Sequence, residues 1–532
     1  MKASRAWFFA FSIVVIVWAL LDVSRPKQGI EPLSTKSVTI ILIDGLSQDL
    51  FNEELAKGRL PHLQSLMQRS LYVENGISSF PTMTGYAFYP FLTGTDACES
   101  GIYGLRWFDK EREKGQLRNY VGRTNVQMNY DVKASPQNLF ELAGTSYTCS
   151  INSYMNRGVK ESVKTGFAHT TAKYEGKIWL SNLASLPWIG KKVIKNHFLH
   201  ETAVADLAMT QLESNPKVQW ITFASPDAYN HVNGTDSIYH HLLRHIDIEI
   251  GRILSKCRDL GHEQRAIAVV SDHGIQDVHT NLDVCKTLKQ KTGLSIERGK
   301  SAVLYSTDLT TPSSKLSTLD AYFVINGNLS AYIYVLDAAK KKLGKQSLER
   351  LMIKNGTTIN LPRELITTEG IELCLMMDEV NGDMYILSKK GRAAITKMGN
   401  KYAYRIVMGM DPLGYENHSE VKKMINNGFF TSEEWLKATL FSEYPDAIYR
   451  FYELVSKNKS GDLVITAAAG YDLASNYEAV VSNYKGGHGS ADRKVISVPY
   501  IYYQPHQKER VEKYMRAEDL GKLIRNYLFG GK

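Results

Sequence analysis

The sequence predicts an α/β fold in which helices flank a mostly parallel central sheet and an α+β cap is inserted. Short, continuous apolar runs end abruptly in polar residues, as in strands that are covered on both faces. Stretches with helical periodicity, such as 239–257, separate these runs and supply the crossovers that parallel strands require. The region 286–440 instead alternates apolar and polar residues, which is typical of antiparallel strands. We therefore expect a core in two parts, 37–285 and 441–532, around a cap at 286–440.

The composition is that of a globular protein. Of 532 residues, 43% are hydrophobic, and 64 Lys+Arg face 55 Asp+Glu, for a formal charge of +9. This balance excludes a disordered tail and a collagen-like fibre. A charge of +9 over this length favours anionic substrates or anionic lipid but marks no basic patch, so we expect no nucleic-acid partner. The five cysteines form no Cys-x-x-Cys, which excludes a zinc ribbon.

Residues 1–36 predict a signal-anchor followed by a linker. Lys2 and Arg5 precede an apolar run at 7–21, which is shorter than the roughly 17–25 residues of a spanning helix and suits the core of a secretory signal. No small-x-small cleavage site follows, so an uncleaved anchor is favoured over a removed peptide or a buried core helix. We expect a membrane-anchored protein whose other residues lie on the non-cytoplasmic side (periplasm, extracellular space or secretory lumen), or a secreted one if the segment is cleaved.

Acidic residues follow three of the predicted parallel strands. The runs 38–43, 218–223 and 266–270 lead into Asp44, Asp227 and Asp272, and a fourth run, 463–466, is assigned to the same sheet. Ligands of open parallel sheets bind beyond the carboxyl ends of the strands. We therefore expect the three carboxylates to lie close together at that edge.

Three histidines accompany the carboxylates. His231 stands four residues after Asp227, so a helix that begins at Pro226 puts both side chains on one face. His273 follows Asp272 directly, and His488 sits between glycines, in a loop that can approach a ligand closely. Three carboxylates and three imidazoles fit two divalent ions such as Zn²⁺ better than an all-oxygen magnesium site.

The order of these motifs carries a family resemblance. Pro81-Thr82-Met83-Thr84, Leu92-Thr93-Gly94 and Ser100-Gly101-Ile102, followed by the acidic and histidine motifs, resemble the type I phosphodiesterase/nucleotide pyrophosphatase family of the alkaline phosphatase superfamily. The resemblance covers most of 37–285 and 440–532 and implies an alkaline-phosphatase-like fold. It also implies two zinc sites and a threonine nucleophile at Thr84, which would touch the second site: the first is formed by Asp227, His231 and His488, and the second by Asp44, Asp272 and His273.

The chemistry of a threonine fits this placement. A threonine hydroxyl is a poor nucleophile near neutral pH, and coordination to a metal lowers its pKa. Two divalent ions against three carboxylates leave a charge of about +1, which attracts a phosphate anion. We expect a hydrolase of phosphoric esters, phosphodiesterase-like, that works through a phosphothreonine. Thr82 is the rival nucleophile, and only the resemblance favours Thr84.

The motifs depart from the family pattern beside the nucleophile. Gly85-Tyr86-Ala87 replaces the Phe-Pro-Asn of members that take nucleotides, and Leu105 stands where the family holds phosphate with an Asn. Arg106, the next residue, is either a bidentate phosphate ligand or half of a surface ion pair. These departures favour another phosphoester, such as a lipid headgroup or a glycan phosphate. The alternatives are a phospho-headgroup transferase, a phosphomonoesterase, and a non-catalytic receptor for phosphorylated glycans.

Overall fold

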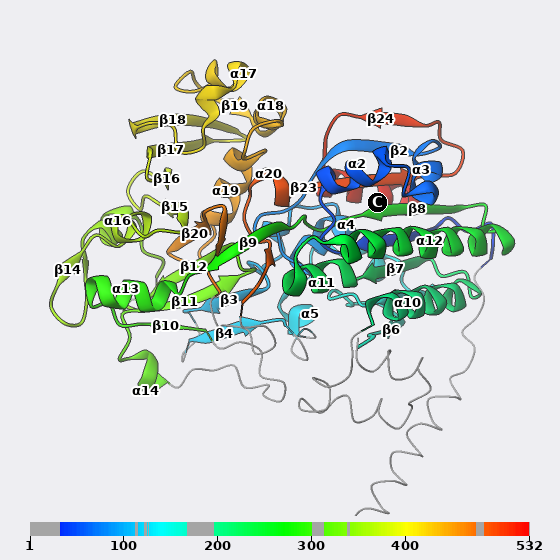
Figure 1. Cartoon of the computed structure of the whole chain (residues 1–532), viewed down its shortest axis with the longest axis horizontal. Coiled ribbons are helices and arrows are strands. Elements are labelled where there is room, and N and C mark those ends of the chain that lie inside the picture. The colour runs from blue at the N-terminus through cyan, green and yellow to red at the C-terminus, as the bar shows by residue number, and fades with distance from the viewer. Residues whose placement is uncertain are drawn as a thin grey trace, which may run out of the picture.

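The structure is a computed structural model that describes residues 32–111, 115–121, 125, 127–166, 196–299, 313–337, 341–474 and 483–530. Two sheets form its frame, and Figure 1 shows them side by side, with helices α10 (His197–Leu212) and α12 (Ser237–Asp259) along the outer side of one. Nearly all of the predicted signal-anchor and linker, residues 1–31, lies outside the described residues. Among the residues described, no helix is both long and apolar enough to cross a bilayer.

The first sheet is the mostly parallel one that the sequence predicts. Strands β8, β1, β7, β5 and β6 run parallel, and β23 lies antiparallel to β8 and β2 at one side. Across the sheet the strands follow the order β24 (Arg510–Glu512), β2 (Leu71–Ile77), β23 (Ser497–Tyr503), β8 (Arg265–Val270), β1 (Ser37–Ile43), β7 (Val218–Phe223), β5 (Thr148–Ile151) and β6 (Glu161–Val163), and β25 (Met515–Arg516) pairs with β2.

Both faces of this sheet are covered, which explains the unbroken apolar runs. In β1, Val38 and Ile40 enter the core that includes residues of helices α4 (Tyr89–Thr93) and α21 (Ala517–Phe529). The intervening Ile41 enters a separate core formed with residues of α10 and α12. A strand whose two faces are both buried favours apolar residues, and the polar ones inside it are paired, as Thr39 Oγ1 is with Gln219 Oε1 at 3.0 Å; the charged side chains appear at the strand ends.

The second sheet is mostly antiparallel and corrects one predicted strand. The run at 463–466 was assigned to the parallel sheet, but β20 lies between β12 and β15, antiparallel to both. All residues of β20 are buried, and a fully buried strand has the same apolar pattern in either kind of sheet. The order is β10 (Ile296–Arg298), β11 (Ala321–Asn326), β12 (Ser330–Val335), β20 (Leu463–Ala467), β15 (Ile371–Met377), β16 (Met384–Leu387), β17 (Gly391–Met398), β18 (Lys401–Gly409) and β19 (Phe430–Thr431).

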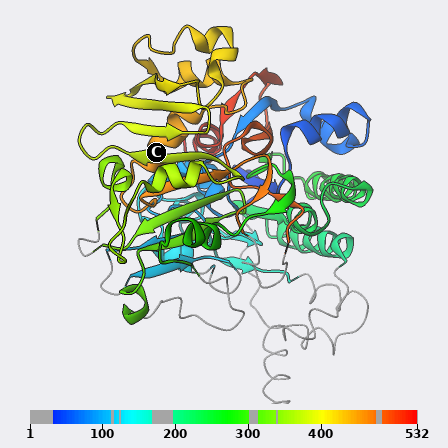
Figure 2. The ribbon, with the colours of Figure 1, turned by 60° about the vertical axis from the view of Figure 1, so that its left-hand side comes forward.

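Figure 2 brings the second sheet forward and shows it stacked against the rest of the molecule. Apart from β20, its strands fall within the predicted cap at 286–440, whose limits stay a prediction. Three small sheets accompany the frame among the described residues, one of them the pair β13 (Leu351–Met352) and β14 (Thr358–Ile359). The hairpin of β3 (Arg106–Asp109) and β4 (Gln116–Asn119) contacts β11, and β9 (Gln276–Asn281) pairs with β21 (Gly470–Asp472) and β22 (Gly486–Gly487).

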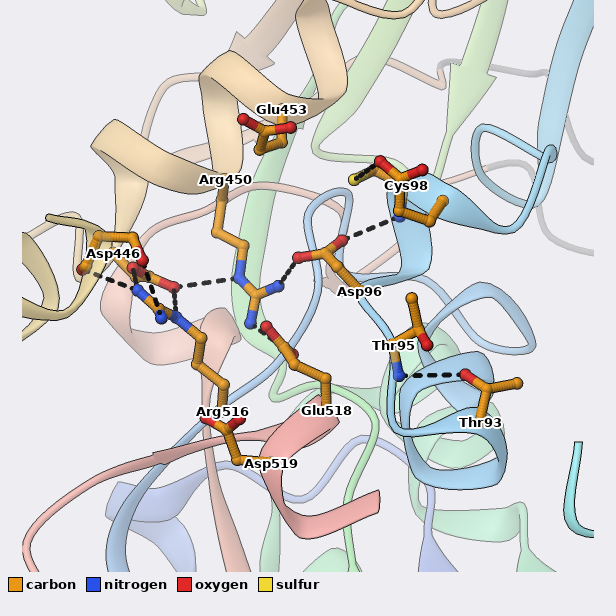
Figure 3. A network of polar contacts seen from close by, with 12 residues as sticks. Thr93, Thr95, Asp96, Cys98, Asp446, Arg450, Glu453, Arg516, Glu518 and Asp519 are labelled. Atoms are coloured by element: carbon orange, nitrogen blue, oxygen red, sulfur yellow. Dashed lines mark hydrogen bonds and ion pairs between the residues drawn. The ribbon is translucent and has the colours of Figure 1, made fainter. Parts of the chain in front are cut away.

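A buried network of charges joins distant parts of the chain, and Figure 3 shows it from close by. Arg450, on helix α19 (Ala447–Val455), binds Asp96, donates to Glu518 Oε2 at 3.0 Å and lies 3.1 Å from Asp446 Oδ2. A second guanidinium, that of Arg516, donates to both oxygens of Asp446 at 2.8 and 2.7 Å. The network therefore ties α19 and the start of α21 to the loop that follows α4.

Candidate metal centre and nucleophile

The carboxyl ends of three adjacent strands meet at one point. Asp44 follows β1, Asp272 and His273 follow β8, and Asp227 lies in the first turn of the helix after β7. At Gly45 the backbone adopts a φ of +77°, and a Cβ there would lie 3.2 Å from the Cα of Asp227. Only glycine accommodates both the conformation and the close approach, so the chain can turn away directly behind the Asp44 carboxylate.

Helix α11 (Ser225–Asn233) carries two of the predicted ligands on one face. Its Asp227 and His231 are one turn apart, and His231 Nε2 lies 3.3 Å from Asp227 Oδ1. His488, which follows β22, approaches the same oxygen with its Nε2 at 3.6 Å. The two imidazole rings lie 5.1 Å apart, centroid to centroid. The structure thus brings the first predicted ligand set together.

The second predicted set lies directly beside the first. His273 Nε2 is 3.5 Å from Asp44 Oδ1 and 3.5 Å from Asp272 Oδ2, and its ring stacks on that of His488 at 3.7 Å with an angle of 7° between the planes. The ligand atoms of Asp44, Asp272 and His273 lie within 4.8 Å of one another, as do those of Asp227, His273 and His488. His273 therefore stands between the two groups, whereas the sequence assigned it to one.

All three histidines turn the same nitrogen toward the carboxylates. Each Nδ1 bonds a backbone carbonyl, which makes Nδ1 the protonated nitrogen and leaves the lone pair of Nε2 free to bind a cation. The carbonyls and distances are Gly486 at 2.8 Å for His231, Gly274 at 3.1 Å for His273, and Thr82 at 2.7 Å for His488.

The electrostatics of the site call for positive charge. Asp227 Oδ1 and Asp272 Oδ2 are buried and accept no hydrogen bond from any described residue. Burial raises the pKa of Asp44, and the nearby carboxylates of Asp272 and Asp227 raise it further. Burial and the charge of Asp227 raise the pKa of Asp272 to about 8. Clustered acceptors without donors fit divalent cations, since these replace the missing donors and remove the repulsion.

The histidines divide into two kinds. Burial lowers the pKa of His231, but the carboxylate of Asp227 outweighs it and raises the pKa to about 8. Burial also raises the pKa of Asp227, yet His231 holds it well below its usual range. Burial lowers the pKa of His273 to about 4, and burial with the neighbouring His273 lowers that of His488. Both are therefore neutral near pH 7, the form that binds metal.

The two candidate threonines differ in their contacts. Thr84 Oγ1 lies 3.1 Å from His273 Nε2 and 3.5 Å from Asp44 Oδ1, so it faces the ligand cluster. The hydroxyl of Thr82 is fully buried, donates to the carbonyl of Ser490 at 2.8 Å and accepts from the N–H of Gly489 at 2.8 Å. Both hydrogen bonds of the Thr82 hydroxyl thus go to the loop that carries His488. The sequence alone did not distinguish this structural role of Thr82 from that of a nucleophile.

Arg106 is buried in β3, so the surface ion pair is the wrong alternative for it. Its Nε donates to Asn119 Oδ1 at 3.3 Å. The Arg106 charge also acts on Tyr154. Burial raises the pKa of Tyr154, the carboxylates of Asp44 and Asp227 raise it further, and Arg106 lowers it.

Sequence reasoning missed Tyr154. A Cβ on Gly85, the residue after Thr84, would lie 3.0 Å from the Cγ of Tyr154, so this ring occupies the space beside the nucleophile. No motif marks Tyr154, because it reaches the site only through the packing of the segment after β5.

Two other clusters of acidic residues lie away from this edge among the described residues. Cys98, Glu99 and Glu453 converge, but Lys457 binds Glu99 and Lys397 donates to Glu453 at 2.5 Å. Glu53, Glu54 and His240 form the other cluster, where lysine and arginine side chains also pair with the carboxylates. Basic side chains already neutralise both groups, so neither resembles the cluster at the strand ends.

Comparisons with known proteins bear on the family and the fold of the chain. A model of the type I phosphodiesterase / nucleotide pyrophosphatase family matches residues 38–491. No curated protein matches the chain. Among solved structures, murine ectonucleotide pyrophosphatase/phosphodiesterase 5, an inactive threonine-to-alanine variant in complex with AMP, is 12% identical with a TM-score of 0.52, over 93% of this chain and 95% of that one.

Two further structures resemble the chain to the same degree. The human ectonucleotide pyrophosphatase/phosphodiesterase 5 is 13% identical, with a TM-score of 0.51 over 93% of this chain and 95% of that one. Phosphonoacetate hydrolase from Sinorhizobium meliloti, in complex with phosphonoacetate, is 14% identical, with a TM-score of 0.51 over 95% of this chain and all of that one (100%). At such identities the similarity establishes a shared fold.

Proposed function

Because this chain belongs to the type I phosphodiesterase/nucleotide pyrophosphatase family, with an alkaline-phosphatase-like α/β fold, and is a hydrolase of phosphoric esters, we propose that it uses Thr84 as a nucleophile at a site of two divalent metal ions. The metal in this proposal is Zn²⁺. The observation that carries it is the placement of Thr84 Oγ1, 3.1 Å from His273 Nε2, beside acceptors that lack donors.

The ligand residues divide the work. Asp227, His231 and His488 would hold one ion, and Asp44 and Asp272 the other, with His273 within reach of both groups. When bound, the ions would lower the pKa of the Thr84 hydroxyl and stabilise the attacking and leaving oxygens of an in-line displacement. The bonds from Nδ1 to backbone carbonyls would keep each imidazole in the tautomer and orientation that ligation needs.

The reaction proceeds in two displacements at phosphorus. Thr84 Oγ1 loses its proton to solvent and attacks the phosphorus, and the bond to the leaving oxygen breaks, so that the phosphoryl group is esterified to Thr84 and the released alkoxide takes a proton from solvent to become the alcohol. Water then loses a proton to solvent as it attacks the same phosphorus, the bond to Thr84 breaks, and Oγ1 takes a proton from solvent, which restores the hydroxyl. Each step exchanges one P–O bond for another, so no further co-reactant is needed.

We propose a phosphodiester other than a nucleotide as the substrate, with a lipid headgroup or a glycan phosphate as the candidates. The support for this part is the sequence beside the nucleophile, where Gly85-Tyr86-Ala87 replaces the Phe-Pro-Asn of members that take nucleotides. Arg106, buried beside Asn119, is proposed to bind a phosphoryl oxygen. A phosphomonoesterase and a phospho-headgroup transferase are the alternatives.

The test compares Thr84→Ala with the wild type. Wild type is expected to hydrolyse bis-p-nitrophenyl phosphate faster than p-nitrophenyl phosphate, to lose activity with a chelator and to regain it with Zn²⁺. The variant is expected to show no turnover but to retain both metal ions, and rapid quench with intact mass measurement should find a phosphoryl adduct in wild type alone. Normal turnover by the variant refutes the nucleophile. Added alcohol separates the transferase, because a transferase would then yield a new diester.

The site of action is proposed to be non-cytoplasmic, with residues 1–36 as a signal-anchor. The support is the sequence of that segment, a basic start followed by an apolar run. Expressed in full, the protein is then expected to stay in the membrane pellet after alkaline carbonate extraction. Its recovery in the soluble fraction would contradict the anchor and leave the chemistry untouched.

A further inference from the structure

A turn of the second sheet reaches into the metal centre. Strands β11 and β12 are joined by Gly327, Asn328 and Leu329, and Leu329 N–H donates to the carbonyl of His488 at 2.9 Å. Gly327 has a φ of +63°, and a Cβ there would lie 2.4 Å from the same carbonyl oxygen. The turn and the loop that carries His488 are therefore in backbone contact, although 160 residues separate Asn328 from His488 in the sequence.

The side chain of Asn328 is the centre of this contact. It is 2% exposed, and all its polar groups are engaged. Its Oδ1 accepts the N–H of His488 at 3.2 Å, and its Nδ2 donates to the carbonyl of Gly486 at 3.2 Å and to Asp472 Oδ2 at 3.1 Å. One amide thus spans the whole loop that carries His488.

The same amide reaches a second ligand through one intermediary. The carbonyl of Gly486 that accepts from Asn328 also accepts Nδ1–H of His231, at 2.8 Å. That bond sets the direction of His231 Nε2 toward Asp227. Asn328 therefore orients two of the three residues that would hold one metal ion, although it is in contact with neither imidazole ring by hydrogen bond.

We propose that Asn328 is a positioning residue of this metal site: through it, the β11–β12 turn of the second sheet orients His488 and His231. This role rests on the proposed function. Partners of metal-ligating histidines typically alter metal affinity by roughly 10–100-fold when they are removed.

The contacts dictate an amide of this length at position 328. An aspartate would keep the acceptor for His488 N–H, but it would place a second carboxylate against Asp472 and the carbonyl of Gly486 with no donor between them. A longer glutamine would not fit, since even a Cβ on Gly487 would lie 2.6 Å from Asn328 Nδ2. Both Asn328→Ala and Asn328→Asp should therefore weaken the site, the aspartate more.

The experiment measures Zn²⁺ binding by equilibrium dialysis with the full-length protein, alongside kcat and KM across a zinc titration. Asn328→Ala is expected to bind one ion as wild type does and the other about 10–100-fold more weakly, with activity returning toward wild type as zinc saturates. The matched control is Asn355→Ala, in the turn between β13 and β14. The Asn355 side chain is exposed, and its Oδ1 accepts a hydrogen bond from Thr357 N–H. The control variant should bind both ions normally.

The outcomes separate the inference from the function. Two ions bound with wild-type affinity by Asn328→Ala and by the nearly isosteric Asn328→Asp overturn the positioning role. A loss of zinc binding in Asn355→Ala equal to that in Asn328→Ala also overturns it, since the site would then respond to a change in a separate two-stranded sheet that does not contact His488. If wild type itself binds no zinc and needs none for turnover, the proposed function falls first and the inference falls with it.

Discussion

Metal loading should release protons, and the structure sets how many. In the metal-free protein burial and neighbouring carboxylates raise the pKa of Asp44, and the pKa values of Asp272 and His231 are each about 8. Asp272 and His231 therefore hold a proton near pH 6.5, and each must lose it to bind a cation. Asp227 is already ionised, while His273 and His488 are already neutral, so they contribute none.

The count predicts both a magnitude and a direction. Binding of two ions at pH 6.5 should release about two protons from Asp272 and His231, and the overall association constant should then rise about 10²-fold per pH unit. Near pH 9, Asp272 and His231 have lost most of their protons in the free protein, so their release should fall well below one proton. Groups with raised pKa values hold protons that compete with the metal. The affinity for metal therefore increases as pH rises, and its dependence on pH flattens above about pH 8.

Isothermal titration calorimetry measures this release directly. Zinc titrations in two buffers with different enthalpies of ionisation, at pH 6.5 and at pH 9, give the number of protons from the difference in heat. Asp272→Asn should release about one proton fewer than wild type at pH 6.5, because the amide carries no titratable proton. Release of less than half a proton by wild type at pH 6.5 would refute the reasoning, since separated carboxylates in water are already ionised there.

Three further predictions concern single side chains. Arg450→Met should lower the free energy of unfolding by about 3–5 kcal/mol in urea titrations, since it leaves Asp96 and Glu518 buried without the guanidinium (Figure 3); a loss under about 1 kcal/mol would contradict this. Arg106→Ala should reduce kcat/KM for bis-p-nitrophenyl phosphate by roughly 10–100-fold with metal content unchanged, and an unaltered kcat/KM would make the residue structural. Thr82→Val should lower the melting temperature, because it loses two hydrogen bonds of about 1 kcal/mol each, but it should keep its turnover per bound metal. Complete inactivity with both metals bound would make Thr82 a candidate nucleophile again.

The parallel strands of the fold followed from local pattern. β1, β7 and β8 could be predicted because burial on both faces favours a largely apolar run, which ends where the strand ends. The same rule misplaced β20, which is equally apolar but pairs with β12 and β15. Periodicity reports how much of a strand is buried, and it carries no information about which strand lies beside it.

The candidate site divides along the same line. The sequence by itself determined the ligand types and the local pairs, because a strand end or one helical turn fixes the relation of Asp227 to His231 and of Asp272 to His273. Only the tertiary structure decided that His273 stacks on His488, that Thr82 holds a loop while Thr84 faces the carboxylates, and that Asn328 and Tyr154 lie beside them. The spacing of residues along the chain determines short-range geometry. Contacts between residues hundreds of positions apart depend on how the two sheets pack, and no local sequence pattern specifies that packing.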